Sequence, residues 1–285
     1  MKIIIKFTLM VLMLFNFSFP QTKGRLVIIG GGKKPEYLMK KFIELAGGEK
    51  SKIIIIPNAS GVPMEEYGYE KEEFVNAGCK NINYLYCNRE EANADSSVEK
   101  LNDITGVYFS GGDQSFLTRD LLGTKLLAKI KDIYEKGGVV GGTSAGAAVM
   151  SKVMITGNEL LNKDSTQAFI EIKKNNIETV EGFGFIKRAI IDQHFLKRKR
   201  HNRLISVVLE HPDLIGVAID ESTSIIVNPD HTFKVLGENQ VLIYDATNAK
   251  DISTDKNGNL SAYNLKMHLL KSGEGYNLET KSVIE

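Results

Sequence analysis

The chain has 285 residues and a mass of 31.6 kDa, which is enough for one large α/β domain or two small ones. Apolar residues make up 42% of it and charged residues 25%, as in an ordinary globular protein. The formal net charge of +1 argues against a general nucleic-acid-binding role, because that role usually needs an overall basic surface.

The first residues differ from the rest of the chain. A basic head, MKIIIK, precedes an almost uncharged stretch over residues 7–19, and PQTKG follows. This pattern predicts a secretory signal peptide over residues 1–22, cleaved between residues 18 and 23, and export to the periplasm or the medium. Because a membrane span needs about 20 apolar residues, no stable membrane anchor is expected. An uncleaved anchor or a buried first strand is the alternative.

Export would permit disulfides, yet the chain has only two cysteines, Cys79 and Cys87. The segment between them, KNINYLY, is typical of a strand. Eight residues of extended chain span roughly 26 Å, far beyond the reach of a disulfide. We therefore expect two free thiols, with no redox pair, no metal site and no cofactor.

Apolar runs that end near glycines alternate with helical patterns in the first half of the chain. Strands are expected over residues 25–32, 52–60, 81–86, 106–114 and 138–142, and helices over 35–48, 69–78 and 116–133. This alternation predicts an α/β fold, a mostly parallel sheet sandwiched by helices. Glycines 30–32, 111–112, 142 and 146 would then meet at the carboxyl edge of the sheet, where ligands bind.

The pattern beyond residue 182 is looser. A strand over residues 188–195, a basic helix over 203–211 and an apolar run over 214–227 precede a β-rich tail from about 232 to 285. Within that tail, Asp255–Asn259 (DKNGN) predicts a hairpin turn. No linker-like segment divides the chain, so residues 23–285 are expected to form a single domain.

The stretch VVGGTSAGAAVM contains GTSAG, which fits the G-x-S-x-G pattern of a strand–turn–helix turn that exposes a serine, here Ser144. Such a serine occupies a strained conformation, and glycines at its flanks let the turn close without Cβ clashes. The following helix directs its first N–H groups at the same point. Ser144 is either a nucleophile or part of an ordinary glycine turn.

A serine nucleophile needs a base and a group that orients the base. Of the five histidines, His194 in IIDQHF follows a predicted buried strand, at the expected active edge. Asp220 and Glu221 follow the next apolar strand, and either carboxylate could hold the imidazole. Spacing alone does not choose between them.

Four segments together resemble one family. FSGGDQ, GGTSAGA, DQHFLKRKRHNRL and GVAIDEST look like the cyanophycinases, relatives of the aspartyl dipeptidase E group of serine peptidases. The first glycine-rich strand and IIIIPNAS agree, so the resemblance covers residues 25–227. It implies a fold similar to the class I glutamine amidotransferases, with serine in place of their cysteine, and a homodimer.

The resemblance also implies roles for individual residues. The triad would be Ser144, His194 and Glu221, in a chain order that differs from the Ser…Asp/Glu…His order of the α/β-hydrolases. From the position of the two glycine turns beside the serine, rather than from the resemblance, we expect the oxyanion to lie against the N–H groups of Gly112 and Ala145. The residues that correspond to the family's substrate-binding positions are Gln114, Asp192, Gln193, Arg198, Arg200 and Arg203.

The basic run KRKRHNR would by itself read as a solvated surface. Its arginines do not share one helical face, so Arg198 and Arg200 are expected in an irregular lead-in that could turn toward the serine. Planar guanidinium groups suit carboxylates of an acidic substrate. Asp192 or Asp113 could accept hydrogen bonds from substrate arginines.

The activity that the resemblance implies is hydrolysis of cyanophycin, a polyaspartate that carries arginine on each β-carboxyl group. The expected product is the β-Asp-Arg dipeptide, released through an acyl-enzyme. Two alternatives remain: an exported exopeptidase for acidic or isoaspartyl peptides, and a non-catalytic binding protein on the same fold.

Overall fold

A computed structural model describes residues 24–161 and 169–284 of the chain. The predicted signal peptide lies outside these residues. No helix within the described ranges is long and apolar enough to cross a membrane.

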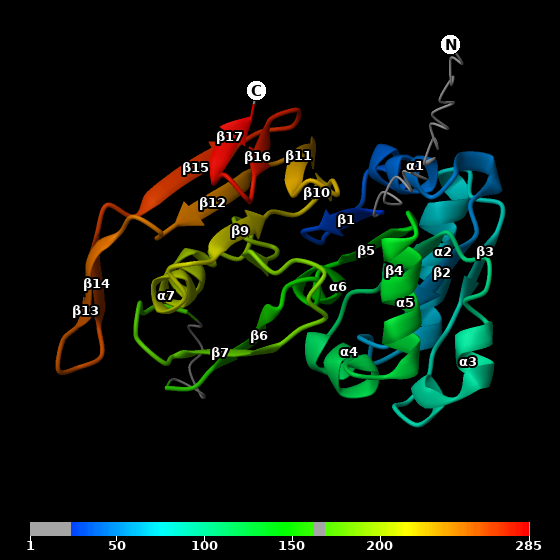
Figure 1. The fold of residues 1–285 in the computed structure, drawn as a ribbon, viewed down its shortest axis with the longest axis horizontal. Helices are drawn as coiled ribbons and strands as arrows, with labels where there is room; N and C mark the ends of the chain where they lie inside the picture. The colour runs from blue at the N-terminus through cyan, green and yellow to red at the C-terminus, as the bar shows by residue number, and fades with distance from the viewer. Residues whose placement is uncertain (1–23, 162–168, 285) are drawn as a thin grey trace, which may run out of the picture.

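A nine-stranded sheet forms the centre of the molecule (Figure 1). Five parallel strands make up one part of it, in the order β1 (Arg25–Ile29), β5 (Val139–Thr143), β4 (Gly106–Phe109), β2 (Ile53–Ile56) and β3 (Ile82–Tyr84). Beyond β1 the sheet continues antiparallel through β10 (Thr223–Val227), β11 (Thr232–Gly237), β16 (Gly275–Asn277) and β17 (Ser282–Ile284).

Alternation along the parallel strands sends side chains into two cores. On β2, Ile54 and Ile56 enter one core, and Ile53 and Ile55 enter the other. Helices α1 (Glu36–Leu45) and α2 (Pro63–Asn76) cover the second face, and α4 (Gln114–Leu121), α5 (Lys125–Glu135) and α6 (Ala145–Ala148) cover the first. Helix α3 (Asp95–Glu99) packs beside α5. The prediction of an α/β fold with a central, largely parallel sheet between helices is confirmed.

The single helix expected over residues 116–133 is wrong, because the chain forms α4 and α5 instead. Leu122 has an extended backbone, and Gly123 has a φ of +76°. Thr124 then starts α5, where its side-chain oxygen accepts a hydrogen bond from the N–H of Leu127 at 3.3 Å. The apolar stripe is continuous because both helices pack on the same core.

A second sheet holds β15 (Lys266–Leu270), β12 (Val241–Asp245), β9 (Ile215–Ile219) and β8 (Ala189–Asp192) in that order. One face of this sheet shares the core of the large sheet, and α7 (His201–Glu210) covers the other. Two hairpins complete the fold, β6 (Val153–Glu159) with β7 (Ile177–Glu181) and β13 (Lys250–Thr254) with β14 (Leu260–Tyr263). Short 3₁₀ segments lie at Gly48–Lys50 and Glu91–Asn93.

The C-terminal segment is rich in strands, as predicted, but its strands are shared between the two sheets and a hairpin. The predicted turn at Asp255–Asn259 joins β13 to β14, and the Asp255 carboxylate accepts hydrogen bonds from the N–H groups of Asn257 and Asn259. Cys79 and Cys87 are buried free thiols on either side of β3, as predicted.

Candidate active site

Ser144 lies in the sharp turn between β5 and α6. Its φ of +52° and ψ of −107° are strained for a residue with a side chain. A Cβ atom on Gly142 or Gly146 would lie 2.6 or 2.1 Å from the carbonyl oxygen of Phe109 on β4, so both positions require glycine. The N–H of Ser144 donates to the carbonyl oxygen of Ile29 at 3.1 Å, which fixes the turn against the end of β1.

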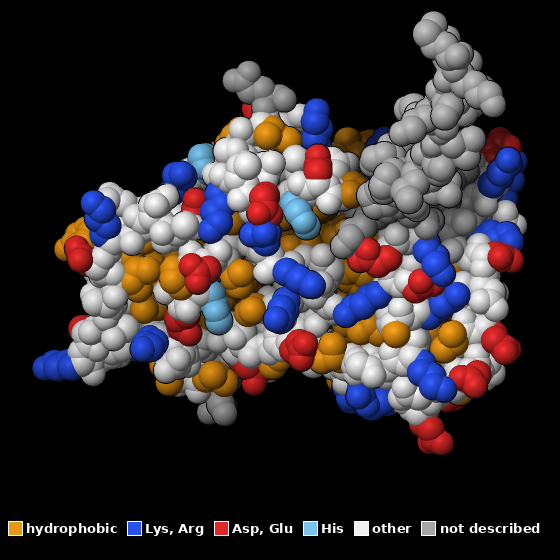
Figure 2. Space-filling model, in the orientation of Figure 1, with side chains coloured by type: hydrophobic (Ala, Val, Ile, Leu, Met, Phe, Trp, Pro, Cys, Tyr) orange, Lys and Arg blue, Asp and Glu red, His pale blue; other side chains and the backbone are white. Residues whose placement is uncertain are grey.

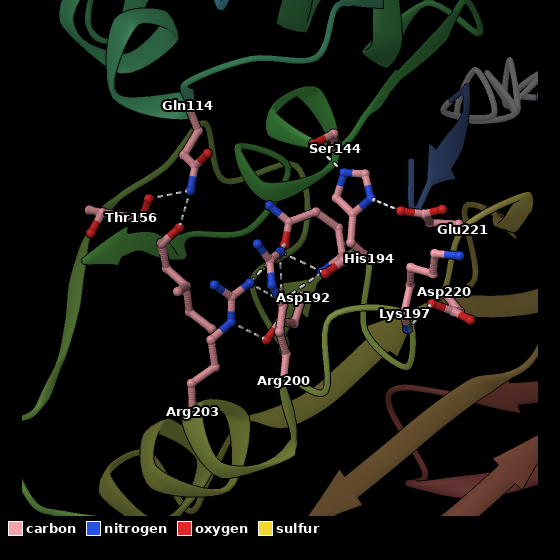
Figure 3. Close-up of polar contacts among 12 residues, drawn as sticks. Gln114, Ser144, Thr156, Asp192, His194, Lys197, Arg200, Arg203, Asp220 and Glu221 are labelled. Atoms are coloured by element: carbon pink, nitrogen blue, oxygen red, sulfur yellow. Dashed lines mark hydrogen bonds and ion pairs between the residues drawn. The ribbon is translucent and has the colours of Figure 1, made fainter. Parts of the chain in front are cut away.

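His194 follows β8 and reaches the serine from the second sheet (Figure 3). Its N–H donates to the carbonyl oxygen of Gly30 at 2.8 Å, and its backbone φ is +48°. Its Nε2 lies 2.8 Å from the Ser144 Oγ. This distance lets the neutral imidazole accept the hydroxyl proton.

Glu221 and Asp220, which the sequence left as alternatives, have different partners. The Nδ1 of His194 lies 2.7 Å from the Oε1 of Glu221. Asp220 instead accepts a hydrogen bond at 3.0 Å from the N–H of Lys197 (Figure 3). With the imidazole proton on Nδ1, the Glu221 carboxylate orients the ring and leaves Nε2 free to accept from the serine.

Gly31 and Gly32 make room for the histidine and the glutamate, a role that the sequence reasoning did not assign to them. A Cβ atom on Gly31 would lie 2.2 Å from the Cε1 of His194, and one on Gly32 would lie 2.9 Å from the Oε2 of Glu221. Their φ values are +111° and +70°. The signal in the sequence was the run of three glycines directly after β1, which predicts a place at the ligand-binding edge of the sheet but not these two contacts.

The N–H groups of Gly112 and Ala145 flank the serine. Neither has a hydrogen-bond acceptor among the described residues. Gly112 has a φ of +133°, and a Cβ atom there would lie 2.1 Å from the carbonyl oxygen of Ala59. Its neighbour Gly111 lies next to Ser144, because a Cβ atom on Gly111 would be 3.5 Å from the serine Cβ. The two free donors can therefore serve an oxyanion.

The electrostatic surroundings keep His194 neutral. Burial is the largest cause that lowers the pKa of His194 from its ordinary value, and the positive charges of Arg198 and Arg200 lower it further. The hydrogen bond to Glu221 acts in the opposite direction without reversing the shift. A neutral imidazole is the form that can act as a general base.

Asp192 and Arg203 pair with each other inside the protein. Arg203 donates through Nε to the Asp192 Oδ2 at 2.8 Å and through Nη2 to Oδ1, and both side chains are fully buried. The same guanidinium donates to the Oε1 of Gln193 at 2.9 Å. The idea that Asp192 accepts hydrogen bonds from substrate arginines therefore does not fit this geometry, because Arg203 occupies its carboxylate.

Arg198 and Arg200 lie in the irregular segment before α7, as predicted. Arg198 is exposed. Arg200 donates at 2.8 Å to both the carbonyl oxygen and the Oε1 of Gln193, and its buried Nε has no partner among the described residues. Burial, followed by the charge of Arg203, lowers the pKa of Arg200 to about 10, so it remains charged at neutral pH.

The last two residues predicted to contact the substrate are Gln114, the first residue of α4, and Asp113, which precedes the helix. The Nε2 of Gln114 donates to the carbonyl oxygens of Ile155 and Thr156 at 2.8 and 2.5 Å, which ties α4 to β6 (Figure 3). Asp113 is exposed and caps α4 by accepting from the N–H of Ser115 at 2.8 Å. In the space-filling view, lysine and arginine side chains gather near the middle of this face (Figure 2).

Comparisons with known proteins place the chain in a family. Residues 26–235 match the family described as Peptidase family S51. The chain is 34% identical to a cyanophycinase of Synechococcus elongatus over 92% of this chain and 81% of that protein. It is 32% identical to one of a Nostoc species (92% and 88%) and 31% identical to one of Geminocystis herdmanii (90% and 95%).

Two solved structures share the fold. The chain is similar to a peptidase from an acI-B1 Actinobacterium, with a TM-score of 0.66 and 24% identity over 90% of this chain and 98% of that one. A putative peptidase E protein from Listeria monocytogenes gives a TM-score of 0.50 and 16% identity over 76% of this chain and all of that one.

Proposed function

This chain belongs to peptidase family S51 and is a serine-type peptidase, and from that premise we propose that it degrades cyanophycin from a chain end. The proposed products are β-Asp-Arg dipeptides, released through an acyl-enzyme. The observation that carries the proposal is the unbroken path of hydrogen bonds from Ser144 through His194 to Glu221. Beside it lie two arginines, Arg200 and Arg203, with one carboxylate, Asp192, between them.

In the first half of the reaction, the Oγ of Ser144 attacks the main-chain carbonyl carbon between two aspartyl units. The Nε2 of His194 takes the hydroxyl proton as the new C–O bond forms, and Glu221 stabilises the resulting imidazolium. His194 then protonates the leaving amine as the C–N bond breaks. A water molecule hydrolyses the ester in the second half, with His194 again as the base.

The negative charge of the tetrahedral intermediate would be held by the N–H groups of Gly112 and Ala145. Neither N–H has an acceptor in residues 24–161 and 169–284, and the glycine geometry next to Ser144 also supports this assignment. In comparable enzymes one such donor contributes about 3 kcal/mol to the stability of the transition state.

The arginines support an acidic substrate. Arg200 and Arg203 both form ion pairs with the same carboxylate, Asp192, so the cluster of these three side chains has a net positive charge. Arg198 adds another charge at the surface. A polyaspartate chain end presents carboxylates at close spacing, and planar guanidinium groups bind carboxylates through paired hydrogen bonds. Arg203, occupied by Asp192, would act by holding Gln193 and Arg200 in place.

The substrate is tested by incubating the purified protein with cyanophycin and, in parallel, with Asp-X and isoaspartyl dipeptides, followed by mass analysis. We expect β-Asp-Arg to accumulate from the start of digestion, without longer fragments. Cleavage of the dipeptides alone would replace the polymer with ordinary acidic peptides as the substrate. Release of long fragments would exclude the exopeptidase mode.

Arg198 and Lys199 provide a matched pair, because they are adjacent, exposed and of equal charge. If Arg198 binds a substrate carboxylate, Arg198→Gln raises KM for cyanophycin about tenfold or more, whereas Lys199→Gln changes it less than twofold. Equal effects of the two variants would assign only a diffuse electrostatic role to this segment.

The pH dependence of the reaction follows from His194. Because burial and the neighbouring arginines lower its pKa, the acid limb of kcat/KM should have its midpoint below pH ~6.5, and the rate should be level near neutral pH. Arg198→Gln removes one of the causes of the shift and should move this midpoint to higher pH. A midpoint well above that value in the unmodified protein would contradict the assignment of His194 as the base.

A further inference from the structure

Glu70 is a carboxylic acid in an unusual place. It lies in α2, within the acidic segment YEKEEF, but its side chain is fully buried against the sheet. Its Oε2 accepts a hydrogen bond from the Oγ of Ser110 at 2.5 Å. A buried carboxyl group costs free energy that an apolar residue of similar size would not. The triad does not contain this residue, so the chain retains it for another reason.

The partner of Glu70 occupies the joint between two parts of the site. Ser110 follows β4 directly, and its N–H donates to the carbonyl oxygen of Ile56 at 3.2 Å. Its own carbonyl oxygen accepts a hydrogen bond from the N–H of Gly146 at 3.1 Å, in the helix that follows the nucleophile. The turn Gly111–Gly112 comes next. Three hydrogen bonds therefore fix the residue from which this turn starts.

The groups around Glu70 favour its neutral form. The pKa of Glu70 is raised to about 8, with burial as the largest cause and the carboxylates of Glu66 and Glu73 on α2 acting in the same direction. Lys34 lowers the pKa but is paired with Glu73 at 2.9 Å, and the Ser110 hydrogen bond also lowers it. Tyr108 on β4 is fully buried nearby, and its own pKa is raised well above the usual range, so it stays uncharged.

We propose that Glu70 is a positioning residue of the peptidase site, which holds Ser110 and thereby aims the N–H of Gly112 at the oxyanion. The proposal rests on the proposed function. A neutral carboxyl group can hold Ser110 without adding negative charge behind the turn, where it would oppose the developing oxyanion. Ionisation of Glu70 therefore weakens the oxyanion hole, and the reaction has an alkaline limb near pH 8 that belongs to Glu70.

Kinetics of Glu70→Gln, Glu70→Ala and Ser110→Ala test this role, with Glu65→Gln and Glu65→Ala as controls on the exposed side of the same helix. Glu70→Ala and Ser110→Ala should lower kcat about 10–100-fold and leave KM within about twofold, because the contact acts on the transition state. Glu70→Gln keeps an acceptor for Ser110, so it should retain kcat within about threefold and lose the alkaline limb. The controls should match the unmodified protein.

Hydrogen exchange of the peptide that covers residues 110–114 separates this inference from the proposed function. Exchange there should rise in Glu70→Ala but not in the Glu65 variants. If no variant cleaves any peptide while exchange behaves this way, the proposed function fails and the positioning role stands. Unchanged exchange in Glu70→Ala, or an alkaline limb that persists in Glu70→Gln, would overturn the role of Glu70.

Discussion

Ser144→Ala is expected to lower kcat by about 10⁴–10⁶-fold while the protein stays folded. The variant loses the oxygen that we propose as the nucleophile, and the remaining donors of the site can contribute only part of the rate. The alanine Cβ occupies the position of the serine Cβ, so the strained turn at φ +52° is kept. Cyanophycin hydrolysis and thermal unfolding, measured on the same preparation, provide the two readouts.

Ser253→Ala provides the control, since Ser253 is exposed on β13 in the second hairpin. It should leave both rate and unfolding temperature unchanged. Labelling by a fluorophosphonate should occur in this control and disappear in Ser144→Ala. A Ser144→Ala protein that cleaves at a near-normal rate would remove Ser144 as the nucleophile, and with it the acyl-enzyme mechanism.

Gly31→Ala is expected to lower kcat by about 10²–10³-fold, although residue 31 has no side chain to take part in the chemistry. Its new methyl group would lie 2.2 Å from the Cε1 and 2.5 Å from the Nε2 of His194. The imidazole must therefore leave the position from which it contacts Ser144 and Glu221. Steady-state kinetics gives the loss, and the fluorophosphonate labelling rate reports the reactivity of the serine directly.

Gly47→Ala separates the clash from backbone strain. Gly47 has the same φ as Gly31, +111°, but the nearest atom to a Cβ there, the backbone nitrogen of Ser51, would lie 3.8 Å away. Both alanines would have to adopt this positive φ, so each variant is expected to lose about 1 kcal/mol or more of stability through backbone strain. Only Gly31→Ala should lose activity. Equal activity of the two proteins would mean that His194 tolerates the displacement.

The fold could be read from the sequence because its signals are local. Each parallel strand is a short apolar run that ends in glycine or a polar turn, and each crossover helix has its own apolar stripe. The sequence pattern did not reveal the break at Gly123, because the apolar faces of α4 and α5 both pack on the same core. The sharing of C-terminal strands between two sheets depends on pairings distant in sequence, which no local pattern records.

The positions of Ser144 and His194 could be predicted from the sequence, because each follows a recognisable strand, β5 for the serine in GTSAG and β8 for the histidine. The remaining features depend on what lies opposite in space. Asp220 and Glu221 are neighbours in the chain, but only one of them contacts the imidazole. Likewise, Arg203 looked equivalent to Arg198 in a basic run, although it is buried against Asp192.

Glu70 illustrates the same limit. In YEKEEF it is one acidic residue among several, and the period of the helix does not reveal that a carboxyl group faces the sheet. Its burial and its contact with Ser110 distinguish it from Glu65 and Glu72, which are exposed. A helix of low amphipathicity gives no phase from which burial could be inferred.

The end of β1 and the two glycines after it bind, through backbone hydrogen bonds, the three segments that carry Ser144, His194 and Glu221. The carbonyl oxygens of Ile29, Gly30 and Gly31 accept, in order, from the N–H groups of Ser144, His194 and Ser222, the residue after Glu221. The backbone positions of Ser144, His194 and Ser222 are therefore each fixed by a hydrogen bond to the same short segment, Ile29 to Gly31. Insertions in exposed loops of the connecting segments, outside α6, β8, α7 and β9, should therefore leave the positions of these three residues relative to one another unchanged.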